Sequence, residues 1–194
     1  MSETGYGQPL CHDDWLPPSL QRQVHDFLMQ PGWQFGWKSD PQTDRHAFWH
    51  RHFAGTQMPG GEEPDCADEL AMRVPLLHRL WLALAEAMPG QMLVRCYANG
   101  HAFGGEGSVH IDTRSPTGHT TIYYPHESWD ANWGGETVFF TPDRSDIIAA
   151  VYPKPNRRVT FAGAIPHAAR GVSRICPHLR VTLMFKTEAA VAKG

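Results

Sequence analysis

The clearest evidence for the fold class of this chain lies in residues 119–161, HTTIYYPHESWDANWGGETVFFTPDRSDIIAAVYPKPNRRVTF. This stretch contains short runs of apolar and β-branched residues that are separated by turn-forming residues such as Gly134-Gly135 and Pro153. These runs span residues 119–124, 137–140, 147–152 and 158–161. No helical pattern separates them, which argues against a parallel α/β sheet. The stretch therefore predicts the short strands of a sandwich or barrel.

The strand pattern continues on both sides of this stretch. Further runs lie at residues 92–98, 108–112, 165–170 and 179–186. About eight short strands joined by tight turns are typical of a jelly roll. We therefore expect an α+β chain with an all-β core over residues 95–186 and flanking helices. Residues 1–194 are interpreted as a single domain, with a small polar tail at 187–194.

Residues 1–94 carry the helical patterns. A helix is expected from Pro18-Ser19 to about Gln30, because Pro31-Gly32 stops it, and a shorter one over Glu69–Arg73. A third follows Pro75, where apolar residues fall at helical spacing: Leu76, Leu77, Leu80, Trp81 and Leu84. The alternation of Trp33, Phe35 and Trp37 predicts a strand with one buried face. We expect these helices to pack on one sheet of the core, and the rest of this region to supply elements on the substrate side.

Composition excludes several classes of protein. Apolar residues make up 41% and charged residues 19% of the 194 residues, which is a globular composition. The net charge of −3 argues against a broad grip on nucleic acid, and no apolar run approaches the roughly 20 residues that span a bilayer. The first residues lack the pattern of a secretory signal, and the four cysteines form no CxxC pair. We expect reduced thiols and a cytoplasmic location.

The triplet His110-Ile111-Asp112 is the first chemical signal. Positions i and i+2 of a strand point to the same face, so an imidazole and a carboxylate project together. A second histidine from another strand would complete a two-His, one-carboxylate face, which suits non-haem Fe(II). The triplet alone is weak evidence, because a surface histidine near an aspartate arises often by chance.

His167 is the best candidate for the third ligand, because it follows a strong apolar strand and the turn Gly163–Pro166. Other histidines are interpreted as exposed or hydrogen-bonded side chains: His101 in a glycine-rich loop, His119, His126 and His178. Arg180 begins an alternating strand in which Arg180, Thr182 and Met184 share one face. A buried arginine there would need an anion such as a carboxylate, whereas an arginine at an exposed strand start would not.

The order of these motifs resembles the Fe(II)- and 2-oxoglutarate-dependent oxygenases, in the prolyl-4-hydroxylase-like branch. The resemblance covers about Leu93 to Lys186 and rests on a series of motifs. They are Arg95-Cys96-Tyr97, His110-Ile111-Asp112, Thr121–Tyr124, Trp129-Asp130, Gly134–Thr137, Pro153–Val159, His167 and Leu179–Thr182. The segment 122–135 is similar to the hypoxia-sensing prolyl hydroxylases.

The resemblance implies a double-stranded β-helix and a residue set for its cofactors. His110, Asp112 and His167 would bind Fe(II), and Arg180 would pair with the distal carboxylate of 2-oxoglutarate. Tyr124 would donate a hydrogen bond to that carboxylate, and Tyr97 would lie near the co-substrate. The implied reaction uses dioxygen, hydroxylates an unactivated C–H bond and converts 2-oxoglutarate to succinate and CO2. A carboxylate at Asp112 argues against halogenation, since related halogenases have Gly or Ala there.

The primary substrate stays open at this point. Many prolyl hydroxylases use a lysine at a closer spacing where this chain has Arg180, and the loop 98–107 is longer and carries four glycines. That loop is interpreted as a mobile substrate lid. We favour a small molecule, such as an amino acid or a natural-product intermediate, over a protein residue, and nucleic acid least. A non-catalytic metal-binding jelly roll and a hydrolase are the remaining alternatives, and the latter lacks a nucleophile motif. The oligomeric state cannot be read from the sequence.

Overall fold

The computed structural model describes residues 7–39, 42–56 and 64–190. Over these residues the chain forms a seven-stranded sheet in the order β1-β8-β5-β10-β4-β3-β2 and a three-stranded sheet in the order β7-β6-β9. The strands are β1 (Leu10–His12), β2 (Gln34–Trp37), β3 (Phe48–Gly55), β4 (Gln91–His101), β5 (His119–Tyr123), β6 (Thr137–Phe140), β7 (Ile147–Val151), β8 (Arg158–Ala162), β9 (His167–Ala169) and β10 (Arg180–Ala189). The helices are α1 (Pro18–Met29), α2 (Ala67–Arg73), α3 (Pro75–Ala87) and the short 3-10 turn η1 (Ala131–Trp133).

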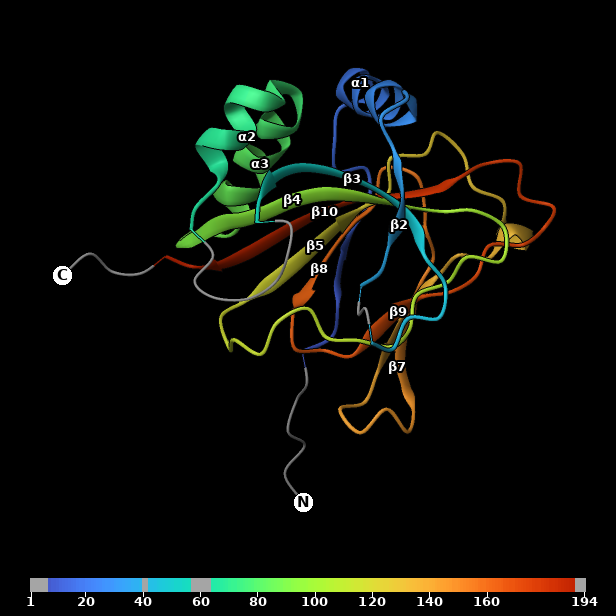
Figure 1. Ribbon diagram of the computed structural model, residues 1–194. Coiled ribbons are helices and arrows are strands. Elements are labelled where there is room, and N and C mark those ends of the chain that lie inside the picture. The colour runs from blue at the N-terminus through green and yellow to red at the C-terminus, as the bar shows by residue number, and fades with distance from the viewer. Residues whose placement is uncertain (1–6, 40–41, 57–63, 191–194) are drawn as a thin grey trace.

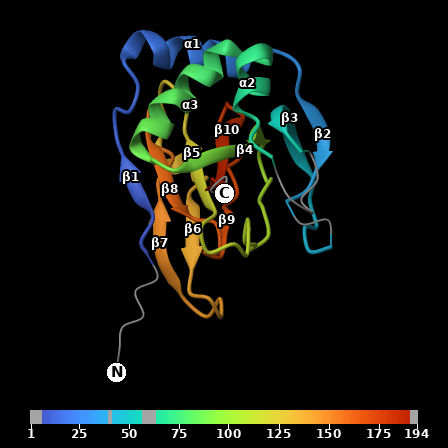
Figure 2. The same cartoon turned by 90° about the vertical axis from the view of Figure 1, so that its left-hand side faces the viewer.

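The helices α1, α2 and α3 cover one face of the large sheet (Figures 1 and 2). Both α1 and α3 begin with a proline at the first helical turn, where its missing N–H is not needed. Their buried apolar residues, including Leu28, Leu80 and Leu84, pack with sheet residues into one core. This packing of helices on one sheet is the arrangement expected from the sequence.

Strand β10 separates two cores by its side-chain alternation. Val181, Leu183 and Phe185 are fully buried against the helices. Met184 instead joins the core between the two sheets, which also contains Phe139 of β6. The predicted division of this strand into two faces is therefore confirmed. The second face, which faces the small sheet, is the one that carries Arg180 and Thr182.

The jelly roll expected from the sequence is confirmed, with differences in several elements. Strand β4 runs to His101 rather than ending at Ala98, so the strand is three residues longer at this end than expected and takes up the start of the glycine-rich loop. Residues 104 and 107 of that loop donate backbone hydrogen bonds to Val172 and Ala169, and the lid stays a prediction. Strand β10 continues through Thr187–Ala189, and the tail residues 191–194 lie outside the described residues.

Two further expectations about strands were wrong. Residues 108–112 form no extended strand but a single antiparallel bridge, His110 with His167. The residues 33–37 do contain strand β2, yet Phe35 is 63% exposed, because β2 is an edge strand that pairs only with β3. Strands β1 and β3 were not anticipated. Among the described residues, none of the helices is long and apolar enough to cross a membrane.

Candidate metal centre and co-substrate pocket

Three side chains meet between the two sheets: His110, Asp112 and His167. His167 is the first residue of β9, and backbone hydrogen bonds connect it to the segment that carries the other two. His110 and His167 exchange two such bonds, of 3.0 and 2.9 Å, and the backbone N–H of Asp112 donates to Gly163 O at 2.8 Å. These bonds place the triplet beside β9 even though it is not a regular strand.

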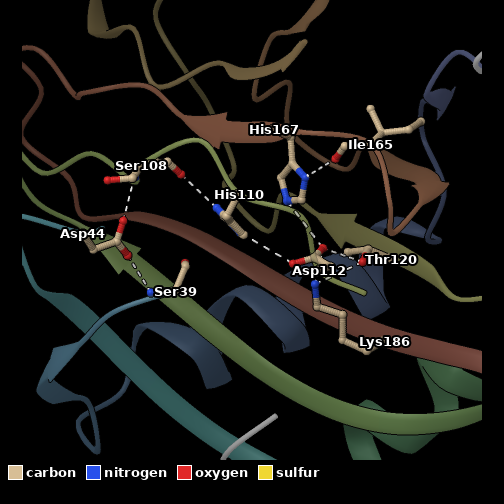
Figure 3. Close-up of polar contacts among 9 residues, drawn as sticks. All are labelled: Ser39, Asp44, Ser108, His110, Asp112, Thr120, Ile165, His167 and Lys186. Carbon is tan, nitrogen blue, oxygen red and sulfur yellow. Dashed lines mark hydrogen bonds and ion pairs between the residues drawn. The ribbon is translucent and has the colours of Figure 1, made fainter. Parts of the chain in front are cut away.

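The ligand atoms of the three residues all lie within 4.8 Å of one another. Nε2 of His110 is 3.5 Å from Oδ1 of Asp112, and Nε2 of His167 is 3.4 Å from Oδ2. The two imidazole rings lie 4.6 Å apart between centroids. Figure 3 shows both imidazoles directed toward the carboxylate. One carboxylate and two imidazole nitrogens thus converge on one point.

Backbone carbonyls determine which imidazole nitrogen is free. Nδ1 of His110 donates to Ser108 O and Nδ1 of His167 donates to Ile165 O, each at 2.9 Å. A carbonyl can only accept, so Nδ1 carries the proton and Nε2 keeps its lone pair for a metal. Burial lowers the pKa of His167 to about 4, which keeps that imidazole neutral. The pKa of His110 is raised, because the Asp112 carboxylate outweighs the effect of burial.

The carboxylate of Asp112 has its own donors on the side of β10 and β5. The ammonium of Lys186 contacts Oδ2, and the hydroxyl of Thr120 donates to the same oxygen at 2.6 Å. Lys186 also donates to Thr120 at 3.0 Å. Burial opposes ionisation of Asp112, but the charge of Lys186 and the neighbouring histidines hold its pKa well below its usual range. Asp112 is therefore an anion.

A loop from the N-terminal region reaches the same centre. Oδ1 of Asp44 accepts from the backbone N–H of Ser108 at 2.8 Å, and Oδ2 accepts from that of Ser39 at 2.7 Å. Because the carbonyl of Ser108 orients His110, Asp44 connects this loop to a candidate ligand (Figure 3).

Arg180 lies at the other end of the same pocket. It is 1% exposed, and its Nε donates to Gly135 O at 2.5 Å while Nη2 donates to Thr137 Oγ1 at 3.0 Å. The hydroxyls of Tyr124 and Thr137 share a hydrogen bond of 2.7 Å. The pocket is lined by His110, Asp112 and His167 at one end, and by Arg180 and Thr137 at the other.

The structure therefore brings most of the expected site residues to one pocket. Tyr97 lines it together with Arg180, whereas Tyr124 is fully buried and is connected to Arg180 through Thr137. His101 is not in a loop but ends β4 and lines the pocket. His126 is buried, and its Nε2 accepts from the backbone N–H of Val181 at 2.9 Å.

Sequence reasoning missed Lys186, Thr137 and Asp44. Lys186 could have been predicted from the sequence, because the alternation that starts at Arg180 places it on the same strand face as Thr182 and Met184. Thr137 belongs to the quoted motif Gly134–Thr137 but had no role assigned. Asp44 has no sequence signal, since the backbone group that connects it to the centre belongs to Ser108, which is 64 residues away.

The donor set fits a metal ion. Two imidazoles and one carboxylate on a jelly-roll scaffold are the ligand class of non-haem Fe(II) centres. Their free lone pairs converge, and a buried arginine lies within the same pocket. The fold and the site thus define a metal-dependent jelly-roll protein with a position for an anion.

Comparisons with known proteins agree with this class. Residues 92–185 match the family described as the 2OG-Fe(II) oxygenase superfamily. No curated protein matches the chain. The match assigns residues 92–185 of the chain to this superfamily, and the chain is an enzyme that uses Fe(II) and 2-oxoglutarate.

Several solved structures are similar in fold at low sequence identity. A 2OG-Fe(II) oxygenase family oxidoreductase from Burkholderia pseudomallei is 15% identical, with a TM-score of 0.69 over 93% of this chain and 84% of that one. A prolyl-4-hydroxylase from Pseudomonas putida is 17% identical, with a TM-score of 0.59 and coverages of 94% and 93%. HygX from Streptomyces hygroscopicus, solved with iron bound, is 10% identical, with a TM-score of 0.60 and coverages of 94% and 82%.

Proposed function

We propose that this enzyme is a dioxygenase that hydroxylates an unactivated C–H bond of a small molecule, with His110, Asp112 and His167 as the iron ligands. Arg180 pairs with the distal carboxylate of 2-oxoglutarate, and Tyr97 and Tyr124 complete that end of the site. The observation that carries the proposal is the convergence of the three ligand side chains and a buried arginine in one pocket.

The chain's own residues position the reactants. Backbone acceptors hold both histidines with Nε2 toward the centre, and Asp112 supplies the negative charge. Two protein hydrogen bonds fix the guanidinium of Arg180, so it can bind a carboxylate without reorganising. Ile122 and Met184 line the pocket with apolar surface that excludes water. The bound iron and 2-oxoglutarate supply the oxidising chemistry, with succinate and CO2 as products.

The buried setting of the centre supports a small substrate. The side chain of His167 is 4% exposed and that of Asp112 is 7% exposed. The alternative is a prolyl or other residue of a protein, and it is favoured by the similarity to the P. putida prolyl-4-hydroxylase.

All four cysteines lie among the described residues and are free, which supports a reducing compartment such as the cytoplasm. We also propose that residues 1–194 form a single domain.

Anaerobic titration of the Fe(II)-loaded protein with 2-oxoglutarate tests this function. A visible charge-transfer band is expected for the wild type, and succinate release in a screen of small molecules and proline-containing peptides then separates the two substrate classes. Asp112→Ala and His167→Ala should lose the band, whereas His12→Ala, on an exposed strand, should keep it. Bound iron without a band would contradict the Arg180 assignment, and full turnover by Asp112→Ala would remove Asp112 from the ligand set.

A further inference from the structure

His101 is a pocket residue with no role in the reaction so far. It ends strand β4 and lies directly opposite Arg180 on β10 in the strand register. Side chains of directly opposed residues project from the same face of a sheet. Both residues line the pocket, and His101 is only 2% exposed.

The imidazole of His101 is buried without hydrogen bonds. Neither Nδ1 nor Nε2 has a partner among the described residues. By contrast, His110, His126 and His167 each hydrogen-bond to a backbone group. A buried polar group with no partner is costly, and such groups are retained where a ligand or an ordered water satisfies them.

The surroundings of His101 select the kind of ligand. Burial and the neighbouring Arg180 lower the pKa of His101 to about 3, so the imidazole is neutral and has one N–H to donate. The ring packs against Phe48, with centroids 4.7 Å apart, which limits its movement. A neutral N–H donor that lies opposite a guanidinium can donate a second hydrogen bond to a carboxylate that the guanidinium binds.

We propose that His101 donates a hydrogen bond to the carboxylate that Arg180 binds, and that the two residues together recognise the distal carboxylate of 2-oxoglutarate. This inference rests on the proposed function. It makes His101 a determinant of co-substrate selectivity, because an oxo acid that lacks the second carboxylate would gain nothing from it.

Calorimetric binding to the Mn(II)-loaded protein tests the inference without turnover. Two probes are compared: 2-oxoglutarate, and 2-oxopentanoate, which has the same carbon chain but no distal carboxylate. His101→Phe should weaken 2-oxoglutarate about ten- to a hundredfold, which is the range of a hydrogen bond to a charged group. The same substitution should change the affinity for 2-oxopentanoate by less than about threefold. His101→Gln, which keeps a donor, should recover part of the affinity, and His12→Gln serves as the surface control.

Two other results for His101→Phe are possible, and each has a definite meaning. Equal losses for both probes would mean that His101 only supports the shape of the pocket, and unchanged 2-oxoglutarate binding would mean that it makes no contact. Either result overturns the inference while leaving the proposed function intact. A wild-type protein that binds Mn(II) but neither probe would instead overturn both. If His101→Phe does not fold, His101→Leu, which is smaller and also lacks a donor, replaces it in the same comparison.

Discussion

Lys186 and Asp112 form a buried ion pair beside the two candidate histidine ligands (Figure 3). Their side chains are 10% and 7% exposed. Strand register explains the contact, because Lys186 of β10 lies opposite Thr120 of β5, and Thr120 donates to the same carboxylate oxygen. Oδ2 thus has two protein donors, which leaves Oδ1 as the oxygen with more freedom to ligate a metal.

Lys186→Met should destabilise the metal-free protein by roughly 3 kcal/mol, because it leaves a buried carboxylate without its cation. Added Mn(II) should then stabilise the variant more than it stabilises the wild type, since no ammonium repels the ion. Thermal unfolding in EDTA and with Mn(II) measures both effects. Lys154→Met, which breaks a more exposed pair with Asp13, is the matched control and should cost less than about 1 kcal/mol. An unchanged melting temperature of Lys186→Met in EDTA would contradict the prediction.

Gly135→Ala should weaken 2-oxoglutarate binding by displacing Arg180. An added Cβ would lie 2.9 Å from Cδ and 3.2 Å from Nε of Arg180. Gly104→Ala isolates this contact, because Gly104 has a similar positive φ but its Cβ would meet no described atom within 4 Å. Calorimetry should show a loss of about tenfold or more for Gly135→Ala only. Equal affinities of the two variants would mean that Arg180 adjusts without loss.

Thr137→Val should reduce 2-oxoglutarate affinity about tenfold, since the hydroxyl orients Arg180 and bonds Tyr124. Valine has nearly the same shape, so the variant should fold. Thr160→Val is the control, because its hydroxyl bonds Thr121 on the neighbouring strand of the same sheet. If both valine variants bind 2-oxoglutarate equally well, the hydroxyl of Thr137 does not position Arg180.

Stability should fall as the pH drops below about 6.5, partly through His126. Burial, together with the charge of Arg180, lowers the pKa of His126 to about 3 in the folded chain. Between about pH 6.5 and about pH 3 the unfolded chain binds a proton at this histidine that the folded chain does not bind. The free energy of unfolding is therefore highest above about pH 6.5 and falls as the pH is lowered. One such group changes the free energy of unfolding by up to about 1.4 kcal/mol per pH unit.

Urea unfolding of the metal-free protein at pH 7, 6 and 5 measures this dependence. His126→Gln should flatten it, because glutamine does not titrate and its amide can still accept from Val181. His12→Gln on the exposed strand β1 is the control. Identical pH slopes for the wild type and His126→Gln would show that His126 does not contribute.

Periodicity along single strands could be predicted from the sequence. The alternation over residues 180–186 assigned Val181, Leu183 and Phe185 to one face and Arg180 to the other, and the structure has the same division. Such patterns depend only on the two-residue repeat of a strand. The jelly roll and the proximity of the triplet to His167 follow from the same local signals together with the family's motif order.

Features that depend on strand pairing could be read from the three-dimensional structure but not from the sequence. The exposure of Phe35 follows from the edge position of β2, although its alternating sequence is typical of a half-buried strand. The length of β4 follows from its pairing with β10, which carries residues 98–101 into the sheet. The same register places His101 against Arg180, and the pairing of β10 with β5 places Lys186 against Asp112. Register joins residues distant in the chain, and no local pattern encodes it.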